Sequence, residues 1–413
     1  MSSSQFTQTV EDRANQRNAL LAGFLGWTLD AFDFFVLTYV LSDVARDFHR
    51  SRPDIALTLT ASLAMRPVGA VIFGLLADRY GRRLPLMLDV VFYSIVEVLS
   101  GFAPSYSTFL VLRLLYGIGM GGEWGVGASL TLESVPVRWR GFISGLLQEG
   151  YALGNILAAV AYFTIFPHFG WRALFFVGGS PALLSLFIRA NVKESAAWHS
   201  SRTDWTTYWL VVRRNWKRFL YLVLLMAMMN FMSHGTQDLY PTFLSKTRGY
   251  SPHWTAIISI IAGIGAICGG LTFGAYSDRI GRRRAMITAA LLGVVAIPLW
   301  ILSPTTALLI AGGFAMQFMV QGAWGVIPAH INELSPGQLR GFFPGLAYQL
   351  GVLIASSISY IEPVLGERFS YTQSMGVLAA AVLSIGALVI YFGPEAKGAH
   401  FGGPSQPSAQ RYS

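Results

Sequence analysis

Long apolar runs fill most of the chain, and short polar or charged turns separate them. Twelve runs are long enough for a helix to cross the hydrocarbon core of a membrane, which takes about 20 residues. They lie at 19–42, 56–77, 84–103, 107–132, 141–166, 171–190, 219–245, 253–276, 285–303, 306–332, 341–364 and 372–393. Because a backbone inside a bilayer must satisfy its own hydrogen bonds, each run is expected to be helical. The pattern predicts an all-α membrane protein with twelve transmembrane helices.

Two charged turns each occur twice, 200 residues apart. The stretch 74–83 (GLLADRYGRR) returns at 274–283 (GAYSDRIGRR), and 133–141 (ESVPVRWRG) returns at 333–341 (ELSPGQLRG). One common offset for both phrases indicates a tandem duplication of a six-helix unit. We therefore expect two pseudo-symmetric halves, a linker between them and a tail. Their predicted bounds are 1–190, 219–397, 191–218 for a solvated basic linker, and 398–413 for a disordered tail.

Composition and charge fit a chain surrounded by lipid. Charged residues make up 12% and hydrophobic residues 53% of the 413 residues. If the N-terminus is inside, 21 of the 30 Lys and Arg residues fall on that side and seven in the opposite loops. The positive-inside bias then predicts that both termini and the linker are cytoplasmic, in the plasma (inner) membrane. Because these cations are spread over short turns, the net charge of +9 does not indicate a nucleic-acid partner.

Signatures of enzymes and of ATP use are absent from the sequence. It has no Walker loop, no His/Cys cluster with metal-ligand spacing and no nucleophile elbow. We expect a protein that is not an enzyme, needs no metal or cofactor, acts as a monomer in the bilayer and draws energy from an ion gradient. A solute receptor is a remote alternative, since a signalling output segment does not fit in the short tail.

The run 219–245 carries a polar stripe. Asn230, Ser233, His234, Gln237 and Asp238 follow a spacing of three and four residues, which places all five on one helix face. Such a face is costly against lipid and is expected to line the bundle interior or a water-filled cavity. The alternative is a seam of hydrogen bonds between helices. A titratable His beside an Asp favours the first interpretation.

Charged residues within the other runs are candidates for the same site. Arg66 suits two-pronged recognition of a substrate carboxylate, with a permanent ion pair to Asp30 or Asp33 as the alternative. Substrate and aspartate are also able to compete for this arginine. Candidate proton-coupling residues are Asp30, Asp33, Glu123, His234 and Asp238, whereas Asp89 and Glu97 are expected to be structural.

Further polar groups are expected to orient a ligand or to hold the helix ends together. Gln321, Tyr348 and Gln349 offer amides and a hydroxyl to the central region, as do Gln148 and Glu149 of the first half. Asp78, Arg79, Arg140, Asp278, Arg279 and Arg340 are candidate gating residues, because ion pairs between the turns form only while the helix ends are close. Arg82, Arg83, Arg282 and Arg283 are expected instead to anchor the helices at the lipid headgroups.

The repeated turns resemble those of the major facilitator superfamily, and the resemblance covers essentially the whole chain. The helix with the stripe fits Asn-x-x-Ser-His-x-Thr-Gln-Asp-x-x-x-Thr from Asn230 to Thr242. This phrase resembles the fungal lactate/pyruvate:proton permeases, which group with bacterial sialic acid:proton symporters; the first helices of those symporters resemble 30–35. The resemblance implies a central site with alternating access. It also implies symport of a proton with a small monocarboxylate such as lactate or pyruvate, or alternatively with sialic acid or another organic acid or sugar.

Overall fold

The computed structural model describes residues 3–202, 204–358, 360–361, 364–365 and 369–401, and these residues form helices without β-strands. The first half contains α1 (Ser3–Asp47), α2 (Arg52–Tyr80), α3 (Arg83–Gly101), α4 (Tyr106–Ser134), η1 (Val137–Trp139), α5 (Arg140–Gln148), α6 (Gly150–Thr164), α7 (Phe166–Val177) and α8 (Ala182–Asn191). The linker forms α9 (Ala196–Ser201) and α10 (Trp205–Arg214). The second half contains α11 (Trp216–Gln237), α12 (Tyr240–Thr242), η2 (Phe243–Thr247), α13 (Pro252–Ile280), α14 (Arg282–Ile301), α15 (Thr306–Leu334), η3 (Gly337–Leu339), α16 (Phe343–Ala355) and α18 (Tyr371–Phe392).

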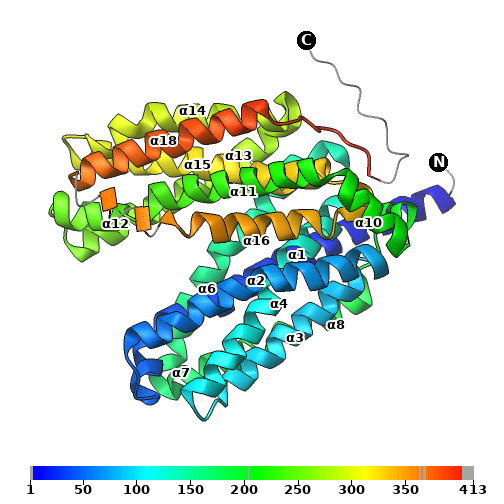
Figure 1. Ribbon diagram of the computed structural model, residues 1–413, viewed down its shortest axis with the longest axis horizontal. Helices are drawn as coiled ribbons and strands as arrows, with labels where there is room; N and C mark the ends of the chain where they lie inside the picture. The colour runs from blue at the N-terminus through cyan, green and yellow to red at the C-terminus, as the bar shows by residue number, and fades with distance from the viewer. Residues whose placement is uncertain (1–2, 203, 359, 362–363, 366–368, 402–413) are drawn as a thin grey trace.

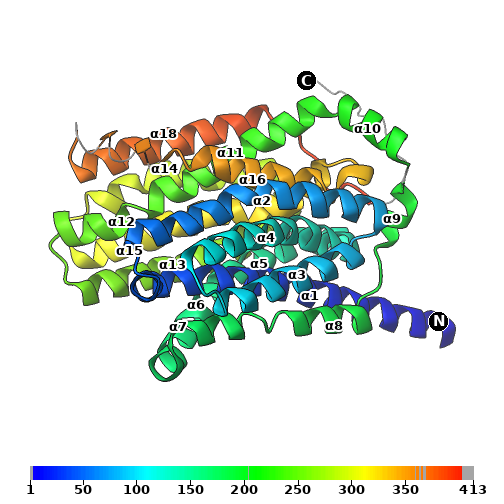
Figure 2. The same ribbon diagram turned by 60° about the horizontal axis from the view of Figure 1, so that its bottom comes forward.

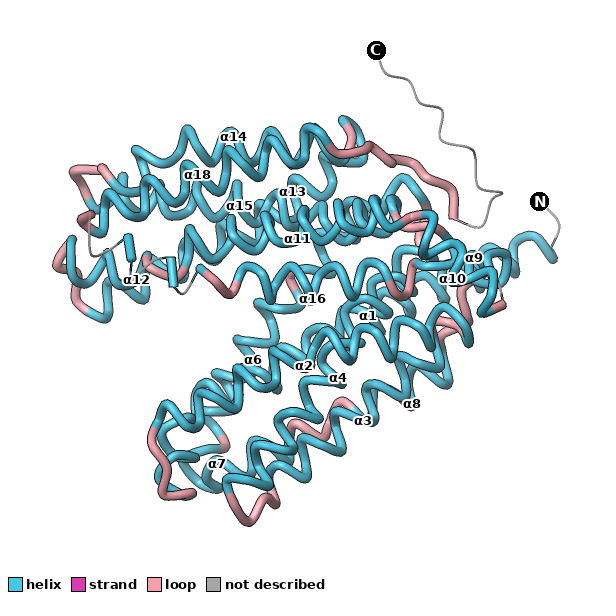
Figure 3. The backbone as a smooth tube through the Cα atoms, in the orientation of Figure 1, coloured by secondary structure: helices cyan, strands magenta, loops and turns pink. Residues whose placement is uncertain are grey.

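The two halves form two helix bundles that meet at one end and diverge toward the other. Figure 1 shows that they meet where α10 lies, and that α7 and α12 mark the ends that diverge; Figure 3, in the same orientation, shows α9 beside α10. We call the first of these the linker end and the second the far end. In the turned view of Figure 2, α9 and α10 again lie at the linker end. The connecting loops gather at the two ends of the bundles (Figure 3), as expected for helices that cross one membrane.

Nine helical segments among the described residues are long and apolar enough to cross a membrane. The other three predicted runs coincide with α4, with α5 plus α6, and with α16 and the residues after it, some of which are not described. Many of the residues in α4 are glycines that pack against neighbouring helices. A Cβ on Gly117 or Gly121 would collide with the backbone carbonyl of Ser62 or Arg66 in α2. These glycines let α4 approach α2 closely, which brings Arg66 into the interior.

Two of the predicted runs are divided into consecutive helical segments. The run 141–166 is divided at Glu149 into α5 and α6, and the run 219–245 is divided at Asp238 and Leu239 after α11. The dihedral angles at all three residues stay helical, and the N–H groups of Glu149 and Asp238 still donate to the backbone oxygens four residues earlier. Pro241 follows the second junction and cannot donate a backbone hydrogen bond. Each run is therefore a helix with a local distortion, in agreement with the hydropathy.

The linker packs against the halves, although the sequence predicts a solvated segment. Trp198 of α9 and Tyr208 of α10 are buried. Trp198 Nε1 donates to the backbone oxygen of Asp78 over 2.8 Å, and the Tyr208 hydroxyl donates to the Asp78 carboxylate over 3.0 Å. An interpretation based on charge misses these contacts, because it weighs the basic residues of the linker and not its aromatic side chains.

The predicted tail begins at the linker end. Residues 402–413 of that segment lie outside the described residues, but 398–401 are described. The ring of Phe401 lies between two arginines, with the Arg140 and Arg340 guanidinium carbons 3.5 and 3.9 Å from its centroid. Arg140 also donates to the backbone oxygen of Ala399. One aromatic ring therefore contacts the equivalent arginine of each half.

Candidate functional site

A cavity of about 530 Å³ lies between the two halves. Helix α11 and the junction after it supply one wall, with the complete predicted stripe. The first half supplies Trp27, Phe35, Gln148, Glu149, Tyr151, Ala152 and Asn155; the second half supplies Asn230, Ser233, His234, Gln237, Asp238, Tyr240, Pro241, Ser259, Ala262, Gly263, Ala266, Gln317, Gln321, Trp324 and Tyr348. The wall of the first half thus combines the aromatic Trp27, Phe35 and Tyr151 with the polar Gln148, Glu149 and Asn155, and the wall along α11 is polar.

The residues of the polar stripe make two kinds of contact: hydrogen bonds to α15, and a pair between His234 and Asp238. Gln237 Nε2 donates to Gln317 Oε1 over 2.7 Å, and Gln321 Nε2 donates to the Ser233 hydroxyl over 3.1 Å. These pairs form part of the hydrogen-bonded seam that was the alternative interpretation. His234 differs, since its Nδ1 lies 3.1 Å from the Asp238 carboxylate, and their side chains are 46% and 41% exposed. The His–Asp pair is thus both titratable and accessible from the cavity.

Arg66 lies behind the aromatic wall and is not among the residues that line the cavity. Its guanidinium carbon is 5.7 Å from the centroid of the Tyr348 ring. Tyr348 stacks on Trp124 at 4.5 Å and meets Trp27 edge-on at 6.3 Å. Arg66 is therefore buried in this conformation, packed against Tyr348, which does line the cavity.

Buried carboxylates gather in the first half. Asp30, Asp33 and Glu123 are fully buried, and both carboxylate oxygens of each lack a hydrogen-bond partner in the described part of the chain. Nε and Nη2 of Arg66 are also without a partner, so this conformation does not contain the permanent pair considered for Arg66. Ion pairing occurs instead between Arg113 and Glu97, 2.6 Å apart. The predicted proton-coupling acids thus lie behind the cavity wall, while His234 and Asp238 lie in it.

At the linker end, two equivalent aspartates hold the halves together. Asp78 accepts hydrogen bonds from the backbone N–H groups of Gly341 and Phe342 over 2.7 and 3.1 Å. Asp278 accepts from Gly141 and Phe142 over 2.9 and 3.2 Å. Asp78 lies near the end of α2, and Asp278 lies near the end of α13, the equivalent helix of the second half. Each aspartate binds backbone N–H groups at the start of a helix in the other half. The duplicated turns therefore make the same contact twice, once in each direction.

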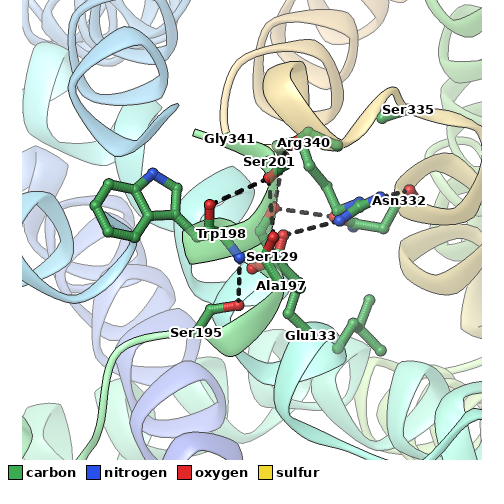
Figure 4. Close-up of polar contacts among 12 residues, drawn as sticks. Ser129, Glu133, Ser195, Ala197, Trp198, Ser201, Asn332, Ser335, Arg340 and Gly341 are labelled. Atoms are coloured by element: carbon green, nitrogen blue, oxygen red, sulfur yellow. Dashed lines mark hydrogen bonds and ion pairs between the residues drawn. The ribbon is translucent and has the colours of Figure 1, made fainter. Parts of the chain in front are cut away.

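Two glutamates that the sequence reasoning did not assign complete these contacts. Glu133 pairs with Arg82 at 3.2 Å and with Arg340 of the other half at 3.1 Å. Glu333 pairs with Arg282 at 2.9 Å and with Arg140 at 3.8 Å. Figure 4 shows Glu133 beside Arg340, with Ser129 bonded to Asn332 and to the backbone of Arg340. Both glutamates lie in the repeated phrase, at 133–141 and 333–341. This repeat was the sequence signal from which their role could have been predicted.

The expected headgroup role of Arg82 and Arg282 is wrong. Both side chains are buried, and they pair with Asp78 and Asp278 respectively. A guanidinium has enough donors to bridge an aspartate and a glutamate at once, which explains why Arg82 and Arg282 occupy these interior positions.

The remaining predicted residues occupy different places. Gln349 is buried away from the cavity, and its Nε2 donates to the Gly121 oxygen over 3.5 Å. Arg279 is exposed at the linker end, and Arg79 lies beside the turn that contains Asp78. Among the described residues, no group of three or more His, Cys, Asp or Glu side chains is arranged to hold a metal ion.

Comparison with known proteins matches residues 23–271 to the Major Facilitator Superfamily and residues 227–397 to the Sugar (and other) transporter family. The carboxylic acid transporter protein homolog of Saccharomyces cerevisiae is 30% identical, covering 92% of this chain and 68% of that protein. The sialic acid transporter NanX of Escherichia coli is 31% identical over 91% and 93%. The solved structure of the proton:xylose symporter XylE superposes with a TM-score of 0.73 at 20% identity, covering 95% and 98%. This likeness confirms the predicted fold of twelve helices in two halves.

Proposed function

Because the chain belongs to the major facilitator superfamily, we propose that it carries a small monocarboxylate across the membrane together with a proton. Lactate and pyruvate are the proposed substrates. The matched families and relatives are transporters, which confirms the prediction that the chain is not an enzyme. A gradient-driven cycle is supported by the division into two halves around one central cavity.

The polar face of α11 is the observation that carries this proposal. All five of its predicted residues line the cavity, and the exposed His234–Asp238 pair offers both a hydrogen-bond donor and a proton-binding group. Asp30, Asp33 and Glu123 lie behind the wall in the same region as Arg66, without bonded partners in the described residues. In the proposed cycle, movement of Tyr348 lets the substrate carboxylate reach Arg66, whose planar donors fit it.

A small acid suits the cavity lining better than a sugar acid with many hydroxyls. Two of the amide groups available on the second half's wall, Gln237 and Gln321, already bond to Gln317 and Ser233. The opposite wall combines Trp27, Phe35 and Tyr151 with Gln148, Glu149 and Asn155. Hydroxyls of a polyhydroxylated ligand that face the aromatic part of this wall would lack partners, which is costly. Sialic acid is nevertheless the second candidate, because the sialic acid transporter NanX is 31% identical.

We further propose that the linker end faces the cytoplasm, in agreement with the distribution of Lys and Arg. The hydrogen bonds that join the halves in the described residues cluster at this end, around Asp78 and Asp278. The conformation is then closed toward the cytoplasm, and the cavity loads substrate from outside.

Counterflow and gradient-driven uptake in proteoliposomes test the proposal. The panel contains lactate, pyruvate, acetate, glycolate and sialic acid. We expect lactate or pyruvate to exchange fastest and to accumulate when the interior is more alkaline than the medium. A protonophore should abolish accumulation but leave exchange intact. Accumulation that ignores the protonophore and follows a sodium gradient would contradict proton coupling, and exchange of sialic acid alone would select the second candidate.

A further inference from the structure

Glu149 lies at the junction of α5 and α6, where the backbone stays helical, and lines the cavity from the first half. Its carboxylate reaches the other half, because Oε1 already fills the position that a Cβ on Gly270 of α13 would take. It is the acidic residue of the first half that lines the cavity, since Asp30, Asp33 and Glu123 do not. Its contact with Gly270 of the other half exposes it to any movement between the halves.

The Glu149 carboxylate has no ion pair or hydrogen bond within the described chain. The charged groups that share its cavity are His234 and Asp238, which bind each other. The titratable hydroxyls of the cavity belong to Tyr151, Tyr240 and Tyr348. The facing parts of α13 and α15 supply Gly270, small residues and amides, and α1 supplies Trp27 and Phe35. An unpaired carboxylate at this depth is costly when ionised, so the site favours a proton or a ligand that brings one.

The duplicated position in the second half gives an internal comparison. Gln349 stands 200 residues after Glu149, within the continuous α16, and is buried with its Nε2 bonded to the Gly121 oxygen. The amide therefore has a packing role away from the cavity. A titratable acid occurs at the equivalent position of the first half, which lines the cavity. Packing alone does not explain the acid, since a glutamine side chain has nearly the same shape.

We propose that Glu149 is a proton-binding residue of the cavity and that it recognises the substrate carboxylate only in its protonated form. This inference rests on the proposed function. The Glu149 carboxyl takes a proton from the outside water, then donates its O–H to a carboxylate oxygen of the substrate. Ionised Glu149 repels the same carboxylate. After the cavity opens to the cytoplasm, the substrate leaves and Glu149 loses the proton to water. Proton and substrate are thus carried together because the substrate binds only while the proton is present.

Glu149→Gln tests this proposal, because the amide keeps the shape and a donor but cannot release a proton. With lactate as the probe, we expect counterflow to persist, accumulation driven by a pH gradient to be lost, and lactate binding to lose the part of its decrease with rising pH that deprotonation of Glu149 causes. Glu149→Asp should restore part of the accumulation, which a merely structural role would not predict. The matched control is Asp12→Asn, which removes an exposed carboxylate of α1 far from the cavity.

Proton-driven accumulation by Glu149→Gln at the wild-type level would overturn the inference. A measurement on the unaltered protein covers the case in which the variant does not fold. A hydrophobic carbodiimide, which modifies protonated carboxyls, should label Glu149, and both lactate and rising pH should reduce the labelling seen by mass spectrometry. Absence of such labelling at a pH where transport is active would also overturn it. If the wild-type protein itself shows no proton-coupled uptake of any acid in the panel, the proposed function fails instead.

Discussion

Among single residues, Arg66 gives the sharpest prediction. Arg66→Lys keeps the charge but loses the two parallel hydrogen bonds that a guanidinium makes to a carboxylate. Removing one member of a buried charge-assisted pair costs about 2 to 5 kcal/mol, and about 1.4 kcal/mol already changes affinity tenfold. We therefore expect Arg66→Lys to weaken lactate binding more than tenfold, almost as much as Arg66→Ala, as measured by calorimetry in detergent.

The control for Arg66→Lys is Arg172→Lys, the same exchange at a partly exposed arginine that pairs with Asp47 and does not line the cavity. It should keep the thermal stability of the protein and change binding far less than Arg66→Lys. Lactate affinity within threefold of wild type in Arg66→Lys would mean that Arg66 has a structural role only, and His234 would become the candidate anchor.

The sequence predicts which residues form the site better than it predicts which of them a ligand can reach. Spacing along one helix was sufficient to place Asn230, His234 and Asp238 on the cavity wall. It was not sufficient to show that Tyr348 packs against Arg66, because that contact joins helices of different halves. Glu149 is the counterpart: its residue type was visible, but its position on the cavity wall against Gly270 depends on how the two halves pack together.

At the scale of elements, the duplicated turns predict paired effects. Asp78→Asn and Asp278→Asn each weaken the hydrogen bonds from two backbone N–H groups of the other half. Hydrogen bonds to charged groups contribute about 1.5 to 3 kcal/mol each. Both variants should therefore open the linker end, with Asp78→Asn having the larger effect because Asp78 also binds Tyr208.

The measurement is alkylation of a cysteine at Ser144, which is buried near these contacts and bonded to the Ala329 backbone. Alkylation should be faster in either aspartate variant than in the parent with the same cysteine. Asp204→Asn, which alters an exposed cap of α10, serves as the control and should leave the rate unchanged. Equal rates in all four proteins would argue against a gating role for the two turns.

Hydropathy predicts the existence of the helices, since each run corresponds to between one and three consecutive helical segments in the described residues. It does not predict where α9 and α10 pack. Their burial rests on Trp198 and Tyr208, which find partners on Asp78, far earlier in the chain. Long-range contacts of this kind leave no periodic signal in a single sequence.

For the whole molecule, the orientation in the membrane is directly testable. A cysteine at Ser200 in α9, introduced with Cys268→Ser so that it is the single thiol, should react with an impermeant maleimide only from the cytoplasmic side. The positive-inside bias is the physical reason. Labelling from the outside of intact cells would reverse the proposed topology and, with it, the side from which the cavity loads. A cysteine at Ser251, at the far end, should show the opposite pattern.

The ring of Phe401 touches Arg140 and Arg340 at the place where the two halves must separate. Separation pulls these arginines apart, so the ring cannot stay on both, and the chain around it must move once in every cycle. An environment-sensitive dye can be attached to a cysteine at the exposed His400, again with Cys268→Ser. Its fluorescence should then change once in every transport cycle. The frequency of this signal should follow the rate of lactate exchange, and Phe401→Ala should remove its dependence on substrate. The movement of the segment around Phe401 would thus report the rate of the transport cycle.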